Sequence, residues 1–341
     1  MKHSPLGRTP RRHAALVGLI VLLSSWLGPA ALPAAGLAED EMQVLVYTRT
    51  TGFRHLSIPD GVAAIQQLGG EHGFGVDHSE DPNAFTDENL AGYDVVIFLN
   101  TTGDPVEDTG QAAFERWVRA GGGWMGIHSA ADTEYDWPFY GELLGGAWFL
   151  AHPPQQPGVI VNEAPDHPAT AHLPEQWPIV DEFYSFQRNP RDGVEVLLSI
   201  DETTYLQDPN TSCLAGFSDL ENTCETGVMG DHPMSWCVNI DEGRSFYTAL
   251  GHESYLYSVP DYLEHLWGGI QTAAQRVEAD CGPVRPGDGD GTASAESDPG
   301  EVTADALAEA AQLPASGGGG VLAAMGMLVG GLAAMRRRRF V

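Results

Sequence analysis

The chain has 341 residues, of which 47 are acidic and 17 are basic, for a formal net charge of −30. Eight of the basic residues lie in short segments at the two ends, so residues 39–316 carry nine arginines against all 47 carboxylates. A surface this acidic repels nucleic acid and anionic membranes, which excludes DNA and RNA as expected partners.

The N-terminal segment, residues 1–38, is predicted to be a signal peptide. Arg8, Arg11 and Arg12 precede an apolar run over residues 14–27, and small residues then lead to a cleavage site after Ala35 or Ala38. This order of basic, apolar and small residues is typical of secretory signals and not of a structural helix. The protein is therefore expected to be exported.

Residues 42–128 are predicted to alternate strands with helices. Continuous apolar runs predict buried strands, and apolar residues three or four apart predict helices. The expected strands cover residues 42–47, 74–78, 94–100 and 124–128, and the expected helices cover residues 59–72 and 109–120. This alternation indicates an α/β fold with an open, mostly parallel sheet and helices on both faces.

The following residues are expected to complete the same domain, which we place at residues 39–282. Added strands are expected at residues 159–162 and 194–200, a final strand at 245–250 and a closing helix at 260–276. The aromatic residues at 137–140 are expected in a loop, where they would face a ligand or a partner. Residues 203–230 indicate an insertion.

Four cysteines lie in the part of the chain that is expected outside the cell: Cys213, Cys224, Cys237 and Cys281. Disulfides are the default for cysteines of exported proteins. Three pairings are open; we favour Cys213–Cys224, which would close a short loop, with Cys237–Cys281, which would fix the end of the domain.

Polar residues follow four of the expected strands. In open parallel sheets, ligands bind beyond the carboxyl ends of the strands. These four ends carry Arg54, His55, Asn100, His128, Asp132, His252 and Glu253. The sequence therefore predicts a site with three histidines at one edge of the sheet.

Four segments carry a resemblance to a known family. They read TGFRH at residues 51–55, GGGWMGIHS at 121–129, DEFY at 181–184 and GRSFYTALGH at 243–252. Together they resemble the ThuA-like (trehalose utilisation) family. The resemblance implies a fold similar to class I glutamine amidotransferases, a flavodoxin-like three-layer sandwich. It also implies action on trehalose-like or other glycosides, including their 3-keto forms.

The tight strand-to-helix turn, or elbow, that follows the strand at 124–128 bears on the mechanism. Glutamine amidotransferases have Gly-x-Cys-x-Gly there, whereas this chain reads GIHSA at residues 126–130, which argues against a cysteine glutaminase. Histidine suits proton transfer because its ordinary pKa lies near neutrality, so His128 and His252 are the expected acid and base. The expected substrate-binding residues are Arg54, His55, Asn100, Asp132, His152, Glu182, Tyr184 and Glu253.

Two other functions fit the same residues. A non-catalytic carbohydrate-binding module would also lack the elbow cysteine. A metal-dependent hydrolase would use His55, His128, His152 and His252 as ligands, and imidazole ligands favour zinc.

The C-terminal region is predicted to attach the protein to the cell surface. Residues 283–312 are rich in Gly, Asp, Ser and Pro, which is typical of a disordered stalk. Residues 313–341 contain the motif Leu313-Pro314-Ala315-Ser316-Gly317, an apolar run and four terminal arginines. This order resembles a sortase sorting signal with Ser316 in the usual Thr position, which implies a sortase-type transpeptidase and the cell wall as partners. The alternative is an uncleaved membrane-spanning anchor, for which the apolar run is marginal in length.

Overall fold

The computed structural model describes residues 41–206 and 228–282. The predicted signal peptide, stalk and sorting signal lie outside these residues, as does the predicted Cys213–Cys224 pair. Within the described ranges, none of the helices has the length and apolar character needed to cross a membrane.

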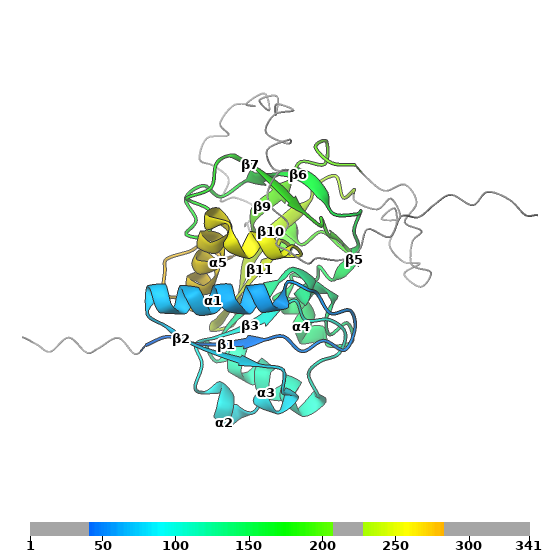
Figure 1. The fold of residues 1–341 in the computed structure, drawn as a ribbon. Coiled ribbons are helices and arrows are strands. Elements are labelled where there is room, and N and C mark those ends of the chain that lie inside the picture. Colours follow the sequence, from blue (N-terminus) through cyan, green and yellow to red (C-terminus); the bar gives the residue numbers. More distant parts are fainter. Residues whose placement is uncertain (1–40, 207–227, 283–341) are drawn as a thin grey trace, which may run out of the picture. The chain divides into compact units, whose positions relative to one another are not determined.

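A nine-stranded sheet forms the centre of the domain, in the order β2-β1-β3-β4-β11-β10-β9-β6-β7 (Figure 1). Its first five strands pair in parallel. They are β2 (Gly75–Ser79), β1 (Gln43–Tyr47), β3 (Val95–Leu99), β4 (Gly123–Ile127) and β11 (Gly243–Thr248). β3 and β4 are buried along their whole length, because helices cover both of their faces, and this explains their continuous apolar sequence.

The other four strands extend the sheet in antiparallel pairing. They are β10 (Pro233–Ile240), β9 (Glu195–Ile200), β6 (Gln156–Asn162) and β7 (Gln176–Asp181). The sequence predicted β9 and part of β6 but neither β7 nor β10. A separate two-stranded sheet pairs β5 (Phe149–Ala151) with β8 (Ser185–Phe186).

Helices cover both faces of the parallel half (Figure 1). One face carries α1 (Ile58–His72) and α5 (Pro260–Ala273), and the other carries α2 (Asp87–Leu90), α3 (Asp108–Arg119) and α4 (Pro138–Leu143). The predicted α/β class is therefore confirmed. Short 3₁₀ helices lie at Pro82–Ala84, His128–Asp132, Arg191–Gly193 and Ser254–Ser258.

The prediction of a loop at residues 137–140 is wrong. These residues begin α4, and Trp137, Phe139 and Tyr140 are buried. Tyr140 packs edge-to-face against Trp124 of β4 and close to Phe98 of β3. The aromatic run belongs to the core because burying large rings stabilises a helix on the sheet more than exposing them to a ligand would.

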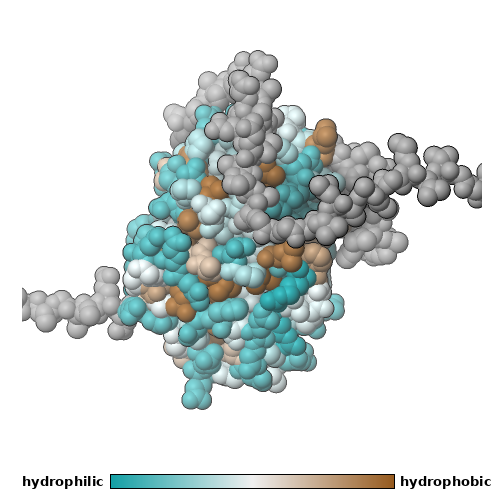
Figure 2. Space-filling view, viewed as in Figure 1, coloured by the Kyte–Doolittle hydropathy of each residue, from teal (hydrophilic) through white to brown (hydrophobic). Residues whose placement is uncertain are grey.

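The surface exposes few large apolar side chains. Figure 2 shows a face that is largely hydrophilic and is interrupted by apolar patches. Within the described residues, the exposed large apolar side chains are Phe53, Leu56, Tyr135 and Leu206. Two of them, Phe53 and Leu56, flank His55 in the segment after β1.

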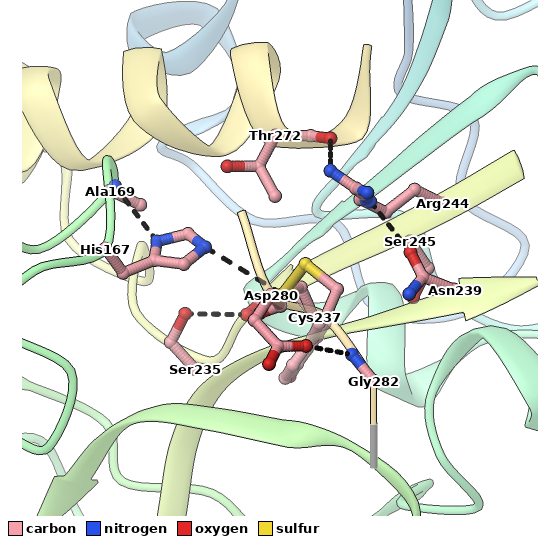
Figure 3. The surroundings of a disulfide bond; sticks show 12 residues. His167, Ala169, Ser235, Cys237, Asn239, Arg244, Ser245, Thr272, Asp280 and Gly282 are labelled. Carbon is pink, nitrogen blue, oxygen red and sulfur yellow. Dashed lines mark hydrogen bonds between the residues drawn. A yellow bond between two sulfur atoms is a disulfide. The ribbon is translucent and has the colours of Figure 1, made fainter. Parts of the chain in front are cut away.

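A buried disulfide joins Cys237 of β10 to Cys281, which follows α5 (Figure 3). This pairing is confirmed. His167 lies beside it, with its Nε2 3.9 Å from the Sγ of Cys237. The bond ties the last residues of the domain to the antiparallel half of the sheet.

Candidate functional site

Three histidines and one glutamate converge at the carboxyl edge of the sheet. His55 follows β1, His128 follows β4, His252 lies just after β11, and Glu182 follows β7 of the antiparallel half. The three imidazole rings stand nearly perpendicular to one another, with centroids 4.9, 5.2 and 5.3 Å apart. One nitrogen or oxygen atom from each of the four residues lies within 4.8 Å of all the others. We call these four residues the His–Glu cluster.

His128 occupies the elbow in a left-handed conformation, with φ at 52°. Its Nδ1 lies 2.8 Å from the carbonyl oxygen of Ala249, so Nδ1 carries the proton and Nε2 of the neutral ring is an acceptor. Nε2 lies 2.9 Å from the hydroxyl of Tyr184. Complete burial lowers the pKa of His128, which keeps the ring neutral.

His252 and Glu182 form a close pair, with Nδ1 2.9 Å from Oε2. Burial alone would lower the pKa of His252, but the hydrogen bond and the charge of Glu182 outweigh it and raise that pKa. Burial would raise the pKa of Glu182, but the hydrogen bond from His252 holds it well below its usual range. Both shifts favour a protonated His252 beside an ionised Glu182.

The backbone at His252 is held by the buried carboxylate of Asp181. Its two oxygens accept hydrogen bonds from the backbone N–H groups of Gly251, at 2.7 Å, and His252, at 3.1 Å. Burial raises the pKa of Asp181 to about 7. Successive side chains of an extended chain point in opposite directions. Asp181 therefore faces the backbone of Gly251 and His252, whereas Glu182 faces the His252 side chain in the cluster.

His55 closes the cluster from the β1 side. Its Nδ1 lies 3.2 Å from the hydroxyl of Ser129. Burial, together with the neighbouring His128 and His252, lowers its pKa to about 2, so the ring stays neutral. Ser129 thus faces an imidazole from its position one residue beyond the elbow.

Two further titratable groups border the cluster. His152 Nε2 lies 3.5 Å from Glu182 Oε2, and Glu253 Oε1 lies 3.7 Å from His252 Nε2. Both are less buried than His128. Both side chains therefore lie at the border between the cluster and the solvent.

A family model described as trehalose utilisation, ThuA, matches residues 43–273. The chain belongs to the ThuA family. A ThuA-like protein from Bacteroides uniformis shares 24% sequence identity with this chain and has a TM-score of 0.55, over 70% of this chain and 94% of that one. One from Parabacteroides merdae shares 20% identity with a TM-score of 0.53, over 70% and 92% of the two chains. These two likenesses show the fold, and no curated protein matches.

Two predicted substrate-binding residues of this ThuA domain, Arg54 and Asn100, bond to residues that are not in the cluster. The guanidinium of Arg54 pairs with Glu80 at 2.7 Å on the surface. Asn100 is buried, and its amide donates to the hydroxyl of Ser57 at 3.0 Å and to the carbonyl of Gly251 at 3.3 Å. In the structure, Asn100 therefore joins the segments that carry His55 and His252.

Asp132 also has a partner outside the cluster. Its carboxylate accepts a hydrogen bond of 2.6 Å from Tyr135, and burial raises its pKa. Of the four ligands that the sequence suggested for a metal, three are in the cluster, and Glu182 takes the place given to His152. The sequence placed Glu182 among the substrate-binding residues and not among the metal ligands, and it did not predict β7, the strand that Glu182 follows.

Proposed function

We propose that this ThuA protein is an exported, surface-attached enzyme that acts on a glycoside or a 3-keto-glycoside, with the His–Glu cluster as its reaction centre. The convergence of His55, His128, His252 and Glu182 at the carboxyl edge of the sheet carries the proposal. The signal-like N-terminus and the sortase-like C-terminus support export and attachment.

Two kinds of observation support a carbohydrate substrate. The family is described as trehalose utilisation. In addition, an exposed aromatic side chain lies beside the cluster. Phe53 is 64% exposed, its ring lies 4.9 Å from that of His55, and such a ring can stack on the apolar face of a sugar.

The proposed reaction is proton transfer beside a carbonyl group, leading to elimination, hydration or isomerisation. It needs a base for the proton on carbon and an acid for the carbonyl oxygen. Neutral His128 offers the lone pair of Nε2, and His252, protonated beside Glu182, offers a proton. Two neighbouring groups in opposite protonation states are the arrangement that acid–base catalysis requires.

The test is turnover of a panel of keto-glycosides by the wild type, His128→Ala and His252→Ala, with ligand binding measured by calorimetry. We expect each variant to lose turnover by about 10²–10⁴-fold while binding persists. His172→Ala is the matched control, because His172 is an exposed histidine bonded to the carbonyl of Asp261. Unchanged turnover in both cluster variants would refute the proposal. Binding of sugars without turnover by the wild type would instead make the protein a carbohydrate-binding module.

A further inference from the structure

We propose that the His–Glu cluster binds one divalent transition-metal ion, with His55, His128, His252 and Glu182 as its ligands. The inference uses the reaction centre of the proposed function but does not depend on the chemistry proposed there. The ion class follows from the donors, since imidazole nitrogens with one carboxylate suit zinc and its first-row neighbours.

The spacing of the donor atoms fits such an ion. Zinc bonds nitrogen and carboxylate oxygen at about 2.0–2.2 Å in a tetrahedron, so its ligand atoms lie roughly 3.4 Å from one another. The atoms of His252 and Glu182 are 2.9 Å apart, those of His128 and His252 3.3 Å, and those of His128 and Glu182 3.6 Å. The fourth donor, His55, lies within 4.8 Å of each and needs only a small inward movement.

In each of the three histidines, the ring nitrogen that would not bind the ion already has a polar neighbour. Metal-binding histidines usually donate their second N–H to a carbonyl, a carboxylate or another polar group, which fixes the ring. His128 Nδ1 donates to the carbonyl of Ala249, and His55 Nδ1 faces the hydroxyl of Ser129. His252 Nε2 faces Glu253 at 3.7 Å. The remaining nitrogens would bind the ion: Nε2 of His55, Nδ1 of His252, and Nε2 of His128, which the Tyr184 hydroxyl now contacts.

His265, a buried histidine outside the cluster, serves as a comparison because its contacts are those of a structural residue. His265 is also fully buried, but its Nδ1 contacts the carbonyl of Ala169 at 2.8 Å and its Nε2 contacts the hydroxyl of Thr248 at 3.2 Å. Both of its ring nitrogens have single protein partners. In the cluster, by contrast, nitrogens of separate rings face one another and share one carboxylate.

One other grouping of potential ligands occurs among the described residues, His167 with Cys237 and Cys281. Its sulfurs are bonded to each other, so neither can supply the thiolate that binds a metal. In the His–Glu cluster the Tyr184 hydroxyl, 2.9 Å from His128 Nε2, must turn aside when the ion binds. Once it has turned aside, this hydroxyl can contact water or another ligand bound to the ion.

Metal binding would change the roles within the site. His128 and His252 would be ligands and no longer acid and base, and the ion would polarise a carbonyl or hydroxyl oxygen of the substrate. Proton transfer would then fall to the bordering groups, His152 and Glu253. The two proposals therefore differ in whether chelation abolishes turnover.

The test is metal content and affinity in the full chain, purified without a polyhistidine tag. After chelation and dialysis, Zn²⁺ is titrated in competition with a chromophoric chelator, and Co²⁺ is used as a spectroscopic probe of coordination. We expect one ion per chain. We expect affinity to fall by about 100-fold or more in Glu182→Gln and His128→Asn, while His172→Asn, the surface control, keeps it. Circular dichroism confirms that each variant is folded.

The outcomes separate the two proposals. Stoichiometric binding that depends on Glu182 and His128 supports the metal site, even if no glycoside is turned over. Absence of stoichiometric binding, or binding that Glu182→Gln and His128→Asn leave unchanged, overturns it. Turnover that survives complete chelation would also overturn a catalytic ion while leaving histidine acid–base catalysis in place.

Discussion

Removing the Cys237–Cys281 bond should destabilise the domain by an amount that its loop length sets. The two residues are 44 apart in sequence. A cross-link that closes a loop of this size lowers the entropy of the unfolded chain by roughly 13 cal/mol/K, or about 4 kcal/mol at 25 °C. We therefore expect the variant Cys237→Ala/Cys281→Ala to lose about 4 kcal/mol of unfolding free energy in urea titrations.

A second variant separates the cross-link from the packing. Both sulfurs are buried, so alanine also leaves a small cavity, whereas Cys237→Val/Cys281→Val fills the space without the bond. If loop entropy dominates, the valine variant is nearly as unstable as the alanine variant. Recovery of wild-type stability by valine, or a loss below about 1 kcal/mol in the alanine variant, would refute the entropic reasoning.

Two further predictions concern binding and pH. Phe53→Ala should weaken carbohydrate binding by about 2–13-fold, since an aromatic contact is worth about 0.5–1.5 kcal/mol, and it should leave the melting temperature unchanged. Leu56→Ala, at a side chain that is 91% exposed, is the control. Equal affinities of Phe53→Ala and the wild type in calorimetry would count against a stacking role. Burial lowers the pKa of His265 to about 3, below its value near 6.5 in the unfolded chain. Between these two pH values the unfolded chain therefore binds one more proton than the folded domain. The free energy of unfolding consequently falls as the pH is lowered from about 6.5 to about 3. His265→Gln should make the slope of unfolding free energy against pH shallower by up to about 1.4 kcal/mol per pH unit, and parallel slopes between about pH 4 and 6 would contradict this origin.

The parallel half of the fold was predictable because its strands are buried on both faces. Such strands read as continuous apolar runs, as in β3 and β4. The rule that ligands lie beyond the carboxyl ends of parallel strands then placed His55, His128 and His252 at one edge, where the structure brings them together.

The rest depended on tertiary packing that local sequence does not encode. β7 contains Pro178 and alternates between buried and half-buried residues, so its pattern is weak and its place beside β6 cannot be read from it. The Trp137–Tyr140 aromatics look like ligand contacts until the packing against Trp124 is known. Asn100 follows a strand just as the histidines do, yet its amide is turned to Ser57 and Gly251.

The four cluster residues are spread along nearly the whole domain, from residue 55 to residue 252, and one of them comes from the antiparallel half. Contacts between residues so distant in sequence form slowly, because much of the chain must be ordered first. No fragment shorter than residues 55–252 carries all four side chains, so a nascent or truncated chain that lacks any of them has no complete His–Glu cluster. Any ion is therefore acquired only after the domain has folded, from the compartment in which folding takes place.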